Sequence, residues 1–94
     1  MEVKQKNDSS KGVFYMEQNG KTVAQMTYVW VGANKIIIDH TEVGESLKGQ
    51  GAGKLMVSKA VEFARQAGIK IVPLCPFAKS VFSKTPDYSD VLLK

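Results

Sequence analysis

Two side chains suited to nucleophilic and proton-transfer chemistry occur once each in this chain. Cys75 is the only cysteine and His40 the only histidine among the 94 residues. A thiolate is a strong nucleophile, and an imidazole titrates near neutral pH and can accept the thiol proton. A base beside a thiol is the minimum arrangement for a covalent route in which cysteine carries an acyl group. Cys75 and His40 are therefore the candidate catalytic residues.

The elements predicted around these residues bring them to neighbouring strand ends. Cys75 ends an apolar run that starts at Ile69, and it directly precedes a helix that opens with Pro76. A helix N-terminus lowers the pKa of a thiol there. His40 lies near the end of a long predicted strand, and a strand–helix–strand crossover makes the two strands parallel neighbours. We expect both side chains to face the same gap between strands.

A glycine-rich turn forms the second candidate site. Gly49, Gly51 and Gly53 alternate between a strand and an amphipathic helix. Glycine lets backbone approach a ligand closely, and a helix N-terminus offers free N–H groups, so the combination suits phosphate or pyrophosphate. A plain structural turn is the alternative. The turn does not match the Walker nucleotide-binding pattern, because Lys48 stands where that pattern has a glycine and Leu55 where it has a serine or threonine. It does not match the dinucleotide-binding fingerprint either, because the third glycine of that fingerprint is missing.

The remaining pattern predicts an antiparallel meander followed by a helix–strand–helix unit. Aromatic and β-branched runs indicate strands, and Asn19-Gly20 indicates a tight hairpin. Apolar residues then recur at helical spacing up to Gly68, a suitable C-cap. We expect strands at 2–6, 13–17, 21–31, 35–43 and 69–75, and helices at 52–67 and 77–84. This ββββαβα order predicts an α+β fold with a mixed, mostly antiparallel sheet, in one domain spanning 1–94.

The composition is that of a soluble globular chain. It is 44% hydrophobic and 23% charged, which excludes collagen-like, disordered and membrane-spanning classes. A net charge of +4 favours an anionic partner without choosing among nucleic acid, a phosphorylated cofactor and a membrane surface. A lone cysteine excludes an intramolecular disulfide, and the charged N-terminus lacks the apolar core of an export signal, so we expect a cytoplasmic protein. We also expect it to be a monomer.

The glycine turn also carries a family resemblance. Lys48-Gly49-Gln50-Gly51-Ala52-Gly53 resembles the acyl-CoA-binding motif Gln/Arg-x-x-Gly-x-Gly/Ala of the GNAT N-acetyltransferase superfamily. The element order resembles the superfamily core without the two helices that usually lie between the first strands. His40-Thr41-x-Val43 and Cys75-Pro76-Phe77 resemble the minimal, short GNAT-like subfamily. The chain departs from the motif at Lys48, where a lysine keeps the positive charge but lacks the planar guanidinium group of arginine.

The resemblance implies acetyl-CoA as the cofactor and assigns residues to it. Backbone amides of the turn would hold the pyrophosphate; these residues are Lys48, Gly49, Gln50, Gly51, Ala52, Gly53 and Lys54. The strand end formed by Thr41, Glu42 and Val43 would pair with the pantetheine arm like an added strand. In this family the fourth and fifth strands splay apart and the thioester lies between them. Lys48, Lys54 and Lys79 would attract the anionic cofactor.

By the same resemblance, the chain would be an N-acetyltransferase acting on an amine or another acceptor that the sequence does not identify. Either Cys75 accepts the acetyl group, or His40 and Cys75 shuttle a proton during direct transfer. The helix after the fifth strand carries Phe82 and no tyrosine, so the general acid common in the superfamily is absent from it. The alternative is a non-catalytic acyl-CoA-binding or sensor module. Nucleic-acid binding ranks last, because no clustered aromatic–basic face supports it.

Overall fold

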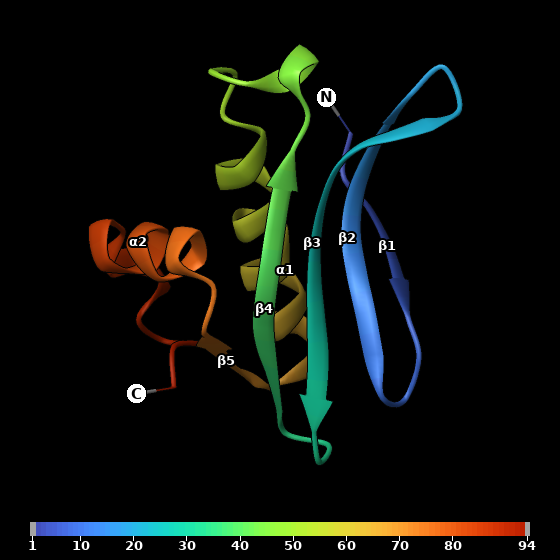
Figure 1. Cartoon of the computed structure of the whole chain (residues 1–94). Coiled ribbons are helices and arrows are strands. Elements are labelled where there is room, and N and C mark those ends of the chain that lie inside the picture. Colours follow the sequence, from blue (N-terminus) through green and yellow to red (C-terminus); the bar gives the residue numbers. More distant parts are fainter. Residues whose placement is uncertain (1, 94) are drawn as a thin grey trace.

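The computed structural model describes residues 2–93 and arranges them as a five-stranded mixed sheet with helices packed against it (Figure 1). The α+β class and the ββββαβα order predicted from the sequence are confirmed. The elements are β1 (Lys4–Asn7), β2 (Lys11–Gln18), β3 (Lys21–Val31), β4 (Lys35–Val43), α1 (Ala52–Ala67), β5 (Lys70–Pro73) and α2 (Pro76–Lys84), with short 3-10 helices η1 (Glu45–Leu47) and η2 (Pro86–Tyr88). Neither described helix has the length and hydrophobicity that crossing a membrane requires.

The sheet keeps the sequence order of its strands, and its last pair separates part-way along. β1 to β4 are antiparallel neighbours, and β5 runs parallel to β4. The last β4–β5 pair is Ile38 with Pro73, which has no N–H to continue the ladder. The backbone N–H groups of Leu74 and Cys75 then both donate to the Ile38 carbonyl at 3.0 Å, and the chain turns into α2. The expected splay between the fourth and fifth strands is therefore present.

The hydrophobic core lies between the sheet and α1, which covers one face of it (Figure 1). The α1 side chains that face the sheet are fully buried at Met56, Val57, Ala60 and Ala64. Gly68 ends the helix in the left-handed conformation with a φ of 69°, as its C-cap position predicted. Phe14 of β2 and Tyr28 and Trp30 of β3 pack against Phe63 of α1, so these three rings form core rather than a ligand surface.

Four predicted elements have different boundaries in the structure, and one of them is β2, which runs over 11–18 rather than 13–17. The strand expected at 69–75 is shorter, because pairing with β4 stops at Pro73. β1 begins at Lys4 rather than residue 2, and α2 begins at Pro76 rather than residue 77, with the proline in the first turn. The C-terminal tail adds a bridge between Leu92 and Ile71 on the outer side of β5.

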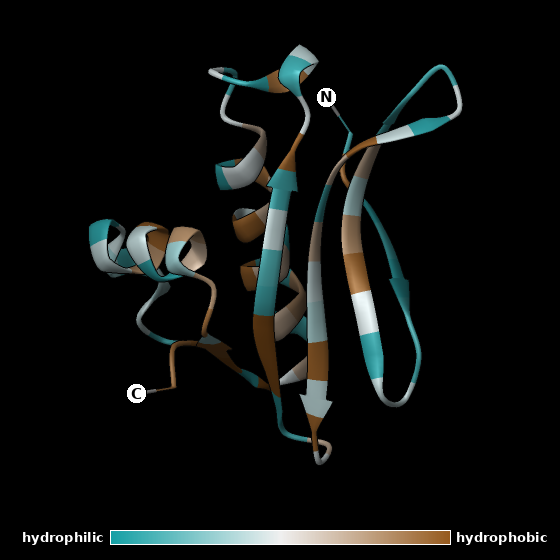
Figure 2. Cartoon of the chain, in the orientation of Figure 1, coloured by the Kyte–Doolittle hydropathy of each residue, from teal (hydrophilic) through white to brown (hydrophobic). Residues whose placement is uncertain are grey.

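A β-bulge in β4 divides the strand into two halves. Tyr28 of β3 pairs with Ile38, but the preceding Thr27 pairs with His40, so Asp39 is an extra residue. The Thr27 hydroxyl donates to Asp39 Oδ1 at 2.6 Å and holds the irregular segment in place. The residue types of β4 also change at this point: the strand is hydrophobic in its first half and mostly hydrophilic in its second (Figure 2). Beyond the bulge, the side chains exchange faces relative to a regular strand.

The buried side chain of Ile38, where β4 and β5 separate, is expected to contribute strongly to the free energy of unfolding. Ile38 is fully buried, whereas Ile37, its neighbour on the other face of β4, is only half-buried. Replacing Ile38→Ala should cost about 2–5 kcal/mol, because it opens a cavity under α1. Ile37→Ala is the matched control, since it removes the same atoms from a partly solvated site. Urea unfolding of both variants should give the larger loss for Ile38→Ala, and equal losses would contradict this packing.

Candidate functional site

The glycine turn exposes its backbone to open space before α1. Gly49 and Gly51 have φ angles of 78° and 76°, in the left-handed region that glycine adopts at little cost. A Cβ atom placed on either glycine would meet no other atom within 4 Å. Gly51 is also the N-cap of α1, and no described side chain caps that helix end. The turn therefore presents bare backbone at a helix N-terminus, and a ligand can approach it closely.

A groove of about 360 Å³ lies over this turn. The first N–H groups of an α-helix have no intrahelical partners, and the helix dipole makes this end electropositive. Such an end is a ready site for phosphate-type anions. The groove is lined by Val43, Leu47, Lys48, Gly49, Gly51, Ala52, Gly53, Lys54 and Phe77.

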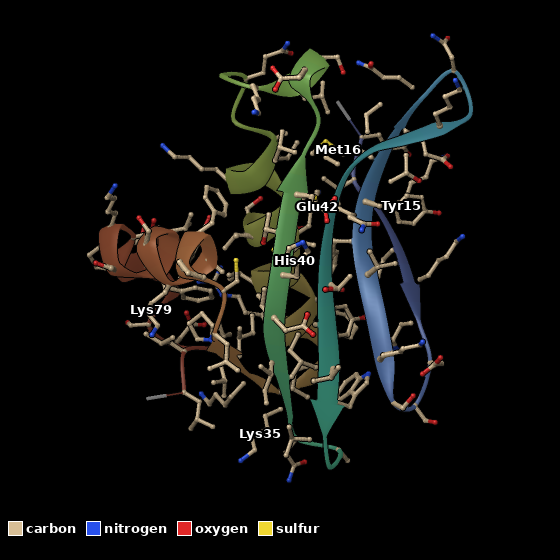
Figure 3. All side chains as sticks on the ribbon, viewed as in Figure 1. Tyr15, Met16, Lys35, His40, Glu42 and Lys79 are labelled. Carbon is tan, nitrogen blue, oxygen red and sulfur yellow. The ribbon has the colours of Figure 1, made fainter. Side chains whose placement is uncertain are left out.

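The polar side chains of the turn differ in whether they line the groove or bond within the turn. Lys48 and Lys54 are exposed and line the groove, and Lys48 Nζ also pairs with Glu45 Oε1 at 2.8 Å. The Gln50 side-chain amide donates to the Ser46 carbonyl at 2.9 Å, so it braces the turn from within. The third predicted lysine, Lys79, is exposed on α2, apart from the glycine turn, and does not line the groove (Figure 3).

The third glycine brings α1 and α2 into contact. Gly53 is buried, and a Cβ atom on it would lie 2.5 Å from Cζ of Phe77, well inside contact distance. The Phe77 ring therefore rests on the backbone of α1, and it also forms one wall of the groove. Sequence reasoning did not place Phe77 in the site. The available signal was its position two residues after Cys75, in the segment Cys75-Pro76-Phe77.

Cys75 is the N-cap of α2 and its side chain is only 6% exposed. The thiol donates a hydrogen bond to the Thr41 hydroxyl, with Sγ and Oγ1 3.3 Å apart. Burial by itself raises the pKa of this thiol, but the Thr41 hydroxyl and the backbone N–H groups of Ala78 and Phe77 outweigh burial. The pKa of Cys75 therefore lies below its ordinary value. The thiol thus lies at the N-terminus of α2, and a lower pKa increases the fraction of it that is thiolate.

His40 lies on a different side of β4 from the thiol. Its Nε2 lies 2.8 Å from Glu42 Oε1, and both side chains are more than half exposed (Figure 3). The bulge at Asp39 causes this placement, because it turns His40 and Glu42 to the open face of the sheet and Thr41 to the inner side. No hydrogen bond joins His40 to Cys75 within residues 2–93. A catalytic role for His40 stays a prediction.

The end of β4 connects the groove to the thiol. Val43 lines the groove at the glycine turn, and two residues earlier Thr41 bonds to Cys75. After Ile38, no described strand pairs with the side of β4 that β5 has left. The segment from Thr41 to Val43 thus has a free edge that runs between the two candidate features. Of the predicted residues, the structure brings together this edge, the glycine turn and Cys75.

Comparison with known proteins identifies the family. A model of the family described as GCN5-related N-acetyl-transferase matches residues 13–91. A GCN5-like protein from Staphylococcus aureus, solved by NMR, is 39% identical, with 98% of this chain and 87% of that chain covered and a TM-score of 0.76. The fold and the glycine turn define an acetyltransferase-type domain, and the chain belongs to the GCN5-related N-acetyltransferase family. None of the curated proteins compared with the chain matches it.

Two more distant solved structures share the fold. A ribosomal-protein-alanine N-acetyltransferase from Brucella melitensis biovar Abortus is 16% identical, with 82% of this chain and 63% of that chain covered and a TM-score of 0.67. A GNAT family acetyltransferase from Elizabethkingia anophelis with acetyl-CoA bound is 14% identical, with 80% of this chain and 52% of that chain covered and a TM-score of 0.62. This chain thus spans about half to two thirds of their lengths.

Proposed function

We propose that this chain binds acetyl-CoA in the groove at the N-terminus of α1 and transfers the acetyl group to an amine acceptor. The observation that carries the proposal is the open backbone at Gly49 and Gly51, in front of the first turn of α1. Its N–H groups, together with Lys48 and Lys54, would stabilise the negative charge of a pyrophosphate. One relative in the family fold has acetyl-CoA bound, which supports the choice of ligand.

The free edge of β4 suits the arm that joins the pyrophosphate to the thioester. An extended chain that carries amide groups can add to an unpaired strand edge through backbone hydrogen bonds. Such an arm would run from Val43, at the groove, past Glu42 to Thr41. The reactive thioester would then lie near Cys75, whose thiol bonds to Thr41.

The chemistry follows from the state of the thiol. The Cys75 thiolate would attack the carbonyl carbon of the thioester, forming a bond from Sγ to carbon and expelling the sulfur of CoA as a thiolate. An acceptor amine would next attack the acetylated cysteine, form an amide and release the Cys75 thiolate. The proton lost by the amine would balance the charge on the released CoA sulfur. A pKa below the ordinary value favours the first step, because it raises the thiolate fraction.

A binding module without turnover is the second candidate. The burial of Cys75 and the placement of His40 beside Glu42 favour it, because no imidazole base touches the thiol within the described residues. Both candidates require acetyl-CoA in the same groove. They differ in whether the cysteine acquires an acetyl group, so binding and acetylation need separate measurements.

Titration of the full chain with acetyl-CoA, followed by amide NMR, tests the binding site. Resonances of residues 49–54 and of Thr41, Glu42 and Val43 should shift, because the ligand approaches their backbone. The amide of Gly20 is an internal control: its φ of 77° matches that of Gly51, and it lies in the hairpin between β2 and β3. Shifts confined to the open face of the sheet would overturn the assignment of the groove.

A further inference from the structure

Among residues 2–93, one side-chain hydrogen bond crosses the gap between β4 and the start of α2. It joins Cys75 Sγ to Thr41 Oγ1 at 3.3 Å, across 34 residues of sequence. We infer that Thr41 is the positioning residue of the Cys75 sulfur and that its hydroxyl stabilises the thiolate. The catalytic meaning of this role rests on the proposed function, in which Cys75 is the nucleophile, but the contact itself does not.

The bulge in β4 selects Thr41 as the partner. In a regular strand, side chains alternate, so the inward series from Ile36 and Ile38 would continue at His40. The extra residue Asp39 shifts this series by one, and Thr41 points inward instead. The structure therefore presents a hydroxyl rather than an imidazole to the thiol.

A hydroxyl at this position can serve both protonation states of the sulfur. In the thiol form, Sγ–H donates to Thr41 Oγ1, as the structure has it. In the thiolate form, the hydroxyl can rotate and donate its own proton to Sγ, because a hydroxyl is both donor and acceptor. Hydrogen bonds to an ionised group are stronger than those to a neutral one, so the contact favours ionisation. No backbone movement is needed.

The groups that act on the thiol are otherwise uncharged. Among those that favour the thiolate, the Thr41 hydroxyl has the largest effect on the pKa of Cys75, followed by the backbone groups of Ala78, Phe77 and Thr41 itself. Of the charged and titratable residues of β4, His40 and Glu42 bond to each other on the opposite face, Asp39 accepts a hydrogen bond from Thr27, and Lys35 lies at the far end of the strand. The side chain of Lys79 on α2 is exposed. Of the described side chains, Thr41 is thus the one whose replacement should directly change the pH midpoint of Cys75 ionisation.

The test compares Thr41→Val, which keeps the shape and loses the hydroxyl, with Thr41→Ser, which keeps the hydroxyl. The rate of alkylation by iodoacetamide is measured against pH without acetyl-CoA, and amide spectra verify that both variants are folded. The midpoint should rise in Thr41→Val, and the rate at pH 7 should fall about fivefold, as expected for one hydrogen bond. Thr41→Ser should restore the wild-type midpoint.

Two results would overturn the inference: an unchanged midpoint in folded Thr41→Val, or a Thr41→Ser variant that titrates like Thr41→Val. Because alkylation needs no acetyl-CoA, the outcome is independent of the proposed function. A wild-type chain that never acquires an acetyl group would contradict the covalent route, whereas a midpoint that does not respond to Thr41→Val contradicts only the role of Thr41.

Discussion

Replacing Cys75→Ser is expected to abolish the acetyl adduct that we predict for the wild-type chain on incubation with acetyl-CoA. The hydroxyl of serine ionises far less readily than a thiol, and the described structure places no base against residue 75. The rate of adduct formation should therefore fall at least about a hundredfold. Intact-mass spectrometry of both proteins, over a time course, measures the difference directly.

The chemical stability of the adduct provides the control for this experiment. Hydroxylamine cleaves a thioester on cysteine but leaves an acetylated lysine amide intact, and the chain has 13 lysine and arginine residues that include surface lysines. An adduct that resists hydroxylamine, or that persists in Cys75→Ser, would contradict the covalent route. Cys75→Ser should still give the shifts of residues 49–54 with acetyl-CoA, because Cys75 does not line the groove. Binding without an adduct in the wild type would favour the non-catalytic module.

The second large effect is expected at the glycine turn. Gly51→Ala should weaken acetyl-CoA binding at least about tenfold, because the new Cβ atom projects into the open space from which the ligand approaches the backbone. The substitution also strains the backbone, since an L side chain is disfavoured at a φ of 76° by about 1–2 kcal/mol. Calorimetric titration measures the affinity, and thermal unfolding measures the loss of stability.

Gly20→Ala is the matched control for the effect of strain. Gly20 has a φ of 77°, and a Cβ atom on it would also meet no atom within 4 Å, but it lies in the β2–β3 hairpin. The two variants should therefore lose similar stability, while only Gly51→Ala loses affinity. Equal affinity losses would mean that destabilisation, rather than obstruction of the groove, explains the result.

Much of the architecture could be predicted because its signals are local. Hairpin residues such as Asn19-Gly20, the helical spacing from Ala52 to Ala67 and the glycine at position 68 each act within a few residues, and β3, β4 and α1 appear where the sequence places them. The end of β5 was less predictable. Its limit at Pro73 depends on where β4 stops pairing with it, which involves a segment more than thirty residues away.

The residues of the candidate site also differ in how well local sequence could predict their positions. All of the predicted turn residues except Gln50 line one groove with Val43, and their binding of a cofactor stays a prediction. Phe77 lines the groove because its ring packs on the backbone of Gly53 in α1, a contact between two helices that local sequence does not reveal. Lys79 lies outside it, because the face of α2 that packs on the protein is decided by the core and not by charge.

By itself, the sequence determined the order of the elements, the open glycine turn and the presence of one thiol at the start of a helix. Only the tertiary structure decided which side chain meets that thiol. Regular alternation along β4 favours His40, but the register with β3 includes the extra residue Asp39, so Thr41 takes the inward position. Register is a property of two paired strands, and a shift of one residue exchanges their faces.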